Sequence, residues 1–356
     1  MKIGILTFHA AHNYGAVLQC YALQEYLTSK GNEVYVIDYR SKYLLNCYRW
    51  FNGKFFFKSI FKFKLIEEWK KMLNKKRRAE KFKTFIQNRF NLIDISVLDT
   101  NFLDYIIIGS DQVWNTKLTN GYDKYYWGQF KHSIQTKIIS YSASLELIWP
   151  KDEDENVKKM LSNFERISVR EKDLAIKLSS LFPNKNIVTC VDPTLLLPKE
   201  RWNKIATTLN IKNKYVLYYQ VRKSNVGMDI ASLLCKELKC KLLVLSASLN
   251  LKNSTECMYA SPESFVSLIK NAEFVVSSSF HGTVFSIIFE KNFISISNGT
   301  KDSRVKNLLT ELNMMDHFIS QIDDFSRTNI YQMSKLNLTT YNNYIKTSKL
   351  YLEQLK

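Results

Sequence analysis

The sequence is poor in the residues that make linkers and cross-links. Its 356 residues include only 10 glycines and 5 prolines, so no flexible linker is evident between parts of the chain. The six cysteines form no CxxC pair, and together with five scattered histidines they give no zinc-binding spacing. We therefore expect reduced, mostly buried thiols and no metal site.

Long hydrophobic runs are also absent. No stretch of about 18 apolar residues occurs, so the sequence predicts no membrane-spanning helix. The apolar residues after Lys2 stop at Thr7 without a small-residue cleavage site, which indicates a first strand rather than a signal peptide. We expect a cytoplasmic protein.

Acidic residues are scarce in one segment. The chain has 51 Lys and Arg against 33 Asp and Glu, but between Arg40 and Arg89 the ratio is 16 to three, a net charge of +13. Aromatic residues are interleaved with these cations, which favours an anionic membrane surface or an anionic substrate as partner. None of the familiar nucleic-acid motifs occurs, so we expect no nucleic acid. A solvated helical face is the open alternative.

Strand-like and helix-like stretches alternate along the whole chain. Strands are expected near 3–8, 33–39, 102–109, 136–142, 214–221, 241–246, 273–279 and 292–297. Helices are expected between them, one over 152–165. This alternation predicts an α/β protein with two doubly wound Rossmann-like domains facing each other across a cleft. We place the first at 1–200, with a basic helical insertion at about 40–92, and the second at 201–330. For the helix at 331–356, packing against the first domain is an open alternative.

Ligands of open parallel sheets bind beyond the carboxyl ends of the strands, so polar clusters that follow strands are the candidate site. Five such clusters occur, at 9–15, 109–115, 140–144, 168–171 and 277–283. In the first, backbone N–H groups at a helix start could hold an anion. His9 and His12 are either ligands or bases there, or plain packing residues. Asp111 is either a base or sugar-hydroxyl acceptor, or a helix cap.

Cations and a histidine complete the pattern. Arg170 follows a short strand, where it could hold a carboxylate or phosphate by two hydrogen bonds or form an ordinary salt bridge. His281 stands at a strand-to-helix turn, where Gly282 and Thr283 open a helix that can face an anion. Histidine changes charge between pH 5 and 8, so His281 is a candidate proton donor, with a buried structural role as the alternative. Lys301 and Arg304 follow the next strand.

Taken together, several ordered motifs carry a family resemblance. They are "FHAAHNYGAVLQCYALQEYL", "IIGSDQVWN", "SYSASL", "ISVREKD", "VDPTLLL" and "VVSSSFHGTVFSIIFEKNFISI". They resemble the polysaccharide pyruvyl transferase family over about residues 3–313. The resemblance implies a two-domain fold of the GT-B type and transfer of the pyruvyl group of phosphoenolpyruvate onto two hydroxyls of a sugar, forming a cyclic ketal.

The resemblance also implies roles for individual residues. Arg170 matches an arginine expected to hold phosphoenolpyruvate, His281 matches the expected general acid, and Lys301 matches a basic donor contact. From position we add Arg304, Gly282 and Thr283 to the donor site and Asp111 to the catalytic pair. We assign acceptor binding to the following residues: His12, Asn13, Tyr14, Gly15 and Ser110.

The resulting hypothesis is a ketal-forming transferase that acts on a surface polysaccharide or on a lipid-linked precursor. Phosphoenolpyruvate is the donor substrate, and no cofactor or metal is expected. A lipid-linked acceptor, together with the basic segment 40–90, would place the protein at the inner face of the cytoplasmic membrane. Two alternatives stay open. One is a GT-B glycosyltransferase that uses a nucleotide sugar. The other is a sugar-binding member of the fold without turnover.

Overall fold

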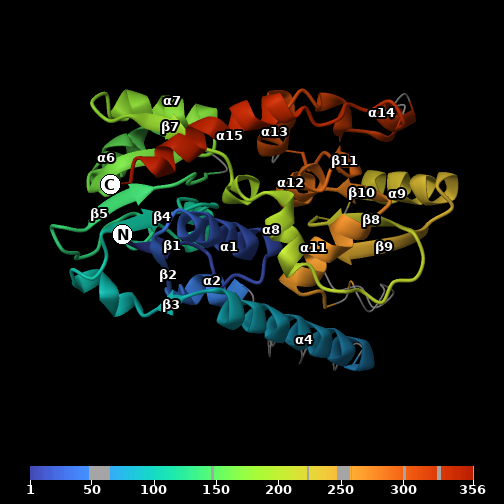
Figure 1. Ribbon diagram of the computed structural model, residues 1–356, viewed down its shortest axis with the longest axis horizontal. Helices are drawn as coiled ribbons and strands as arrows, with labels where there is room; N and C mark the ends of the chain where they lie inside the picture. Colours follow the sequence, from blue (N-terminus) through green and yellow to red (C-terminus); the bar gives the residue numbers. More distant parts are fainter. Residues whose placement is uncertain are drawn as a thin grey trace. The chain divides into compact units, whose positions relative to one another are not determined.

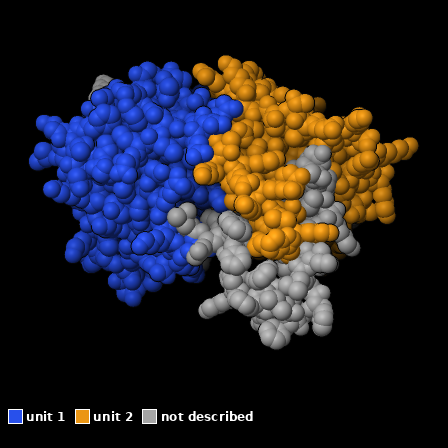
Figure 2. Space-filling model, turned by 90° about the horizontal axis from the view of Figure 1, so that it is seen from below, with its two compact units in different colours: residues 1–48, 86–197, 345–356 blue, residues 49–85, 198–344 orange. Residues whose placement is uncertain are grey.

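The computed structural model describes residues 1–47, 65–145, 148–222, 224–246, 257, 259–299, 302–326 and 330–355. The chain forms two compact units (Figure 2). Unit 1 comprises residues 1–48, 86–197 and 345–356, and unit 2 comprises residues 49–85 and 198–344. The basic segment was predicted to lie entirely in the first domain, whereas the contacts group its described residues 65–85 with unit 2.

Unit 1 is built on a parallel sheet of seven strands (Figure 1). The strands are β1 (Lys2–Leu6), β2 (Glu33–Ile37), β3 (Leu92–Ile93), β4 (Tyr105–Ile108), β5 (Lys137–Ser140), β6 (Phe164–Val169) and β7 (Ile187–Thr189). Their order in the sheet is β3-β2-β1-β4-β5-β6-β7. The order reverses direction between β1 and β4, so the crevice at the carboxyl ends of these two strands is the expected ligand position.

The inner strands of this sheet are apolar on both faces because helices cover both faces of a parallel sheet. All four residues of β4, "YIII", are buried. The helices are α1 (Tyr14–Ser29), α2 (Lys42–Cys47), α5 (Thr116–Thr119), α6 (Asp154–Leu161) and α7 (Lys172–Leu181). Short 3-10 turns lie at η1 (Ile95–Asp99), η2 (Lys151–Glu153) and η3 (Pro193–Leu196). The predicted helix over 152–165 is too long, because Phe164 pairs with Ile138 and is already the first residue of strand β6.

Unit 2 contains a second parallel sheet, of five strands. They are β8 (Tyr215–Gln220), β9 (Lys241–Ser246), β10 (Phe274–Ser277), β11 (Asn292–Ile296) and β12 (Phe318–Ile319), in the order β12-β11-β10-β8-β9. Direction reverses between β8 and β10. The helices are α8 (Lys199–Ile205), α9 (Asn225–Glu237), α11 (Pro262–Asn271), α12 (Phe280–Ile288), α13 (Ser303–Glu311) and α14 (Ile322–Ser326), with a 3-10 turn η4 (Met315–His317).

Two helices belong to both units. The long basic helix α4 (Leu65–Arg89) is grouped with unit 2 up to Phe85, and α15 (Leu338–Glu353) is grouped with unit 1 from Ile345 onward. The two all-parallel sheets confirm the predicted class of two Rossmann-like α/β domains. The cleft between the domains stays a prediction.

Candidate active site

The carboxyl ends of β1 and β4 are tied together at the reversal point of the unit 1 sheet. Thr7, directly after β1, donates its hydroxyl to the carbonyl oxygen of Ser110 at 2.8 Å. Gln19 of α1 donates its side-chain amide to the hydroxyl of Thr7 at 3.0 Å. All three residues are buried, so Ser110 is held in a fixed position below the edge of the sheet.

Asp111 comes next and has a left-handed backbone with φ of 69°. Its carbonyl oxygen accepts a hydrogen bond from Ser144 N at 2.9 Å, and its carboxylate Oδ1 accepts one from Gln112 N at 2.9 Å. The side chain is half-buried, and it caps the next backbone N–H while part of it faces solvent. The arrangement is compatible with both interpretations of Asp111, as a capping carboxylate and as a base.

Arg170, directly after β6, contacts the ends of three neighbouring strands. Its Nη2 lies 2.7 Å from Oδ2 of Asp192, which follows β7, and the side chains are 5% and 0% exposed. Nη2 also donates to the hydroxyl of Ser110, and Nε donates to the hydroxyl of Ser142 at 3.4 Å. The positive charge of Arg170 is therefore balanced inside unit 1, and the side chain acts as a buried clamp.

A second carboxylate lies beside this clamp. Glu171 accepts hydrogen bonds from the Ser144 hydroxyl at 2.6 Å and from Leu145 N at 3.3 Å. Asp192 also caps the turn η3 by accepting from Thr194 N at 2.9 Å. The polar residues after β5, β6 and β7 thus form one buried network.

In the loop after β1, the two histidines lie in different surroundings. His9 is fully buried, with Nε2 at 3.0 Å from Oδ1 of Asp38 and Nδ1 at 3.3 Å from the carbonyl oxygen of Thr7. Both ring nitrogens of His9 face acceptors, so neither is turned toward a ligand. The hydrogen bond from His9 and the neighbouring guanidinium of Arg40 hold the pKa of Asp38 below its usual range. His12 is half-buried.

The acceptor-binding residues expected at the start of α1 are largely used by the helix itself. Asn13 is exposed and caps α1, accepting from Gly15 N at 2.9 Å and Ala16 N at 3.4 Å. Tyr14 and Gly15 are buried. Because Asn13 already accepts from two of the first N–H groups of the helix, the anion-holding capacity expected there is reduced.

In unit 2, Ser278 links the ends of β8 and β10 at the reversal point of the sheet. Ser278 N donates to the carbonyl oxygen of Tyr219 at 3.1 Å, and Val221 N donates to the Ser278 hydroxyl at 3.1 Å. Asn298, beyond β11, donates its side-chain amide to the carbonyl oxygen of Ser278. The chain then turns directly into α12.

The first turn of α12 carries His281, Gly282 and Thr283. His281 is 8% exposed, and its ring packs edge-on against Phe280 with 5.2 Å between ring centres. A Cβ on Gly282 would stand 2.1 Å from Ser277 Oγ, so the close approach of α12 to β10 requires glycine. Thr283 is completely buried, with its hydroxyl 2.7 Å from that of Ser295. Of the three, His281 is the side chain nearest the surface.

Arg304 of α13 completes this group. Its guanidinium lies over the ring of Phe280, 5.8 Å from the ring centre. Asp302, just before α13, accepts from Ser297 Oγ at 2.5 Å and from Asn298 N at 2.6 Å, which anchors the start of the helix to the end of β11. The structure therefore brings Arg304, Phe280 and His281 together. Lys301 lies outside the described residues.

The family model described as polysaccharide pyruvyl transferase matches residues 13–300. The chain belongs to the polysaccharide pyruvyl transferase family. The match includes Asp111, Arg170 and His281, whereas Lys301 and Arg304 lie just beyond it. No curated protein matches the sequence at a significant level.

Solved structures similar to this pyruvyl transferase family member are distant. UDP-N-acetylglucosamine 2-epimerase from Rickettsia bellii is 9% identical over 99% of this chain and 95% of its own, with a TM-score of 0.48. A putative UDP-N-acetylglucosamine 2-epimerase from Listeria monocytogenes is 7% identical over 97% and 90%, with a TM-score of 0.48. ADP-heptose lps heptosyltransferase II from E. coli is 9% identical over 86% and 88%, with a TM-score of 0.35. These similarities decide nothing about the chemistry of this chain.

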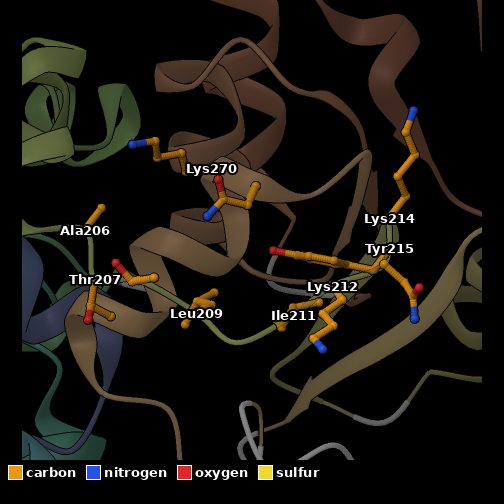
Figure 3. Close-up of a pocket in the computed structure, with 11 residues that line it drawn as sticks. Ala206, Thr207, Leu209, Ile211, Lys212, Lys214, Tyr215 and Lys270 are labelled. Carbon is orange, nitrogen blue, oxygen red and sulfur yellow. The ribbon is translucent and has the colours of Figure 1, made fainter.

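A cavity of about 530 Å³ lies in unit 2, away from these residues. It is lined by residues of the 206–215 connection into β8 together with Lys270 and Asn271. Because the strands are parallel, this end of β8 is opposite to the carboxyl ends where His281 lies. Figure 3 shows the side chains of Lys212, Lys214 and Lys270 pointing in different directions, so they form no common anion site.

Among the described residues, no group of three or more His, Cys, Asp or Glu side chains could hold a metal ion. No helix among the described residues is both long and apolar enough to cross a bilayer.

Four residues of these networks received no role from the sequence: Ser142, Glu171 and Phe280, which lie in the candidate clusters, and Asp192, which lies outside them. Each stands inside a motif that follows a strand, which is the signal that could have identified them. Their roles depend on which way the side chains point, and residue order alone does not give that direction.

Proposed function

We propose that the protein transfers the pyruvyl group of phosphoenolpyruvate onto two hydroxyls of a sugar, in a surface polysaccharide or its lipid-linked precursor. Membership of the family supports the reaction class. The observation that carries the proposal further is the position of His281. It lies at the reversal point of the unit 2 sheet, where ligands of such sheets bind, with the cation of Arg304 close by.

In the proposed reaction, His281 protonates C3 of phosphoenolpyruvate, which leaves a cationic centre at C2. The first sugar hydroxyl adds to C2 and gives its proton to Asp111. The bond between C2 and the phosphate oxygen then breaks, phosphate leaves, and the second hydroxyl closes the ketal. One proton of the diol replaces the proton used at C3, and the other leaves with phosphate. The scheme needs no redox cofactor and no metal.

The donor carries a carboxylate and a phosphate, so it needs cations. We assign this role to Arg304, whose guanidinium is steadied by the face of Phe280. Lys301 keeps the same proposed role. The charge of Arg170 is already matched by Asp192, so we propose that Arg170 acts by positioning Ser110 and Ser142. Gly282 and Thr283 contribute through the packing of α12.

The acceptor side is proposed at the carboxyl end of β4. Asp111 is half-buried and His12 is half-buried, so both have surface for a sugar. Ser110 supports the loop from beneath through its bonds to Thr7 and Ser142. Asn13, Tyr14 and Gly15 define the start of α1 that borders the same loop.

The test is product formation by the full-length protein with phosphoenolpyruvate and a panel of sugars that offer two neighbouring hydroxyls. Mass spectrometry should find the ketal, with equimolar phosphate released. Replacing a positioned acid lowers the rate by about 10²–10⁴-fold, so His281→Gln should lose that much activity. Asp111→Asn should also lose activity without loss of folding, because Asn tolerates a left-handed backbone.

The matched control is His132→Gln, since His132 lies in unit 1 and contacts the carbonyl and the ring of Phe130 in its own loop. It should leave the rate unchanged. Calorimetry with both ligands tests the alternative. Binding of a nucleotide sugar but not of phosphoenolpyruvate would overturn the proposal in favour of a glycosyltransferase.

A further inference from the structure

The basic helix α4 has two faces of different character. Its inner face carries Asn74, Arg78, Phe82 and Phe85, all buried at helical spacing. Its outer face carries Trp69, Lys70, Leu73, Lys76 and Arg77, all exposed. We call these five residues the α4 outer face.

The inner face is fixed firmly to unit 2. Arg78 donates through Nη1 to the carbonyl oxygen of Ser246, the last residue of β9, at 3.1 Å. The ammonium group of Lys81 lies 4.9 Å from the ring centre of Tyr259. Burial lowers the pKa of Lys81. Arg77, on the outer face, also contacts the ring of Tyr259, with its guanidinium 5.7 Å from the ring centre, while its side chain and those of the two outer-face lysines are exposed.

Charge alone does not explain the α4 outer face. Trp69 is 51% exposed and Leu73, one turn later, is 37% exposed. A helix that only needs solvation has no use for a large indole and a leucine on its exposed side. Tryptophan and leucine flanked by lysine and arginine are typical of helices that lie in the interface of an anionic membrane. The acid Glu80 on this side pairs with Lys76 at 3.9 Å, so the face remains positive.

We propose that the α4 outer face docks on the surface of an anionic phospholipid membrane. The lysines and the arginine would lie at the headgroups, and Trp69 with Leu73 would enter the boundary with the acyl chains. Nucleic acid would use the same cations for its phosphates, but none of the familiar nucleic-acid motifs occurs in the sequence.

The position of α4 gives the docking a consequence for the reaction. Arg78 is bound at the carboxyl end of β9, and His281 follows the carboxyl end of β10, with only β8 between the two strands. At the usual spacing, β9 and β10 are about 10 Å apart. Docking through α4 would therefore hold the catalytic edge of unit 2 near the membrane, where a lipid-carried sugar is presented. This step depends on the proposed function, but the docking itself does not.

The test is sedimentation of the full-length protein with vesicles of phosphatidylcholine alone or mixed with phosphatidylglycerol. We expect binding only to the anionic vesicles, decreasing as salt is raised. The double variant Leu73→Ser with Lys76→Gln should lower the partition coefficient at least about tenfold, because it removes an inserted side chain and a headgroup cation.

The chain offers a matched control on α9, where Leu233 is 45% exposed and Lys236 follows at the same spacing. Leu233→Ser with Lys236→Gln should bind vesicles as the wild type does. Equal binding to neutral and anionic vesicles, or equal loss in both double variants, would overturn the docking. Binding of the wild type to duplex DNA but not to anionic vesicles would point to nucleic acid instead.

A second readout separates this proposal from the proposed function. Pyruvyl transfer to a water-soluble sugar should be unchanged in the α4 variant, whereas transfer to a lipid-linked sugar in anionic vesicles should fall with binding. If the soluble reaction is absent in the wild type but vesicle binding follows the expected pattern, the function fails and the docking stands.

Discussion

At the scale of single residues, the pairing of Arg170 with Asp192 determines what substitution at either position should do. Both side chains are almost fully buried, so removing one leaves an uncompensated charge in the interior. Breaking such a pair typically costs about 3–5 kcal/mol, whereas replacing both partners can be nearly neutral.

We predict that Arg170→Met and Asp192→Asn each lower the free energy of unfolding by about 3–5 kcal/mol, and that the double variant loses much less than their sum. Urea denaturation of the four proteins measures this coupling. The exposed pair of Lys158 and Glu155 is the control, and its cycle should give less than about 1 kcal/mol. Strictly additive losses at Arg170 and Asp192 would show that the ion pair is not the source of the effect.

Asp38 gives a prediction for pH. The hydrogen bond from His9 and the guanidinium of Arg40 lower the pKa of Asp38 in the folded protein, so ionisation of Asp38 favours folding. This stabilisation is fully present above the usual carboxyl pKa of about 4 and is lost as the pH falls through the lower folded value.

The wild type should therefore be more stable than Asp38→Asn at neutral pH, and the difference should shrink below about pH 4. Denaturation at a series of pH values measures it. Asp99, an exposed carboxylate, serves as the comparison, and Asp99→Asn should leave the pH profile unchanged. A difference that stays constant down to strongly acidic pH would contradict this origin.

At the scale of elements, α1 shows how one residue serves two possible roles. This helix is buried on nearly every side, so its start must be fixed for the loop at 9–13 to hold its shape. Asn13 supplies the cap, accepting from Gly15 N and Ala16 N. The same residue is proposed to border the acceptor, and stability and activity separate the two roles.

We predict that Asn13→Ala lowers the free energy of unfolding by about 1 kcal/mol, because the cap is lost, whereas Asn13→Ser restores it. If Asn13 only caps, Asn13→Ser should also restore turnover with the wild-type KM for the sugar. If its amide contacts the acceptor, the KM should stay raised in Asn13→Ser although stability has recovered. A loss of stability in Asn13→Ser equal to that in Asn13→Ala would rule out capping as the main role.

At the scale of the whole molecule, most strands were predictable from sequence because each of these is a local apolar run between turn signals, whereas the two-residue strands β3 and β12 were not predicted. The two all-parallel sheets and the location of Asp111, Arg170 and His281 after strands follow from that alternation. The assignment of residues 65–85 to unit 2 did not follow, because it depends on contacts such as Arg78 with Ser246, 168 residues away. The partners of Arg170 could not be predicted for the same reason, because Ser110 and Asp192 follow other strands of the sheet.

Helix α15 makes further contacts with residues that are distant in the sequence. Within unit 1, Val191 N donates to the hydroxyl of Ser348 at 2.8 Å, and Tyr351 donates its hydroxyl to the carbonyl oxygen of Ser140 at 2.8 Å. Ser140 ends β5 and Val191 follows β7, so α15 satisfies buried groups right beside the Arg170 network. Tyr351 also packs beneath the guanidinium of Arg166, 4.9 Å from its ring centre.

Ser348→Ala removes the partner of the buried Val191 N–H, at a cost of about 1–3 kcal/mol. Tyr351→Phe removes one of the two hydrogen bonds to the Ser140 carbonyl, which keeps the bond from the Ser168 hydroxyl at 3.1 Å. We predict that the double variant speeds amide hydrogen exchange in β5, β6 and β7, while the strands of unit 2 keep their protection. Thr347→Ala with Leu350→Ala changes the exposed side of the same helix and is the control, expected to leave every strand unaffected. Faster exchange in both sheets alike would mean that α15 stabilises the chain as a whole, whereas a change confined to unit 1 would show that the last turns of the chain complete the edge on which Arg170 and Asp111 stand.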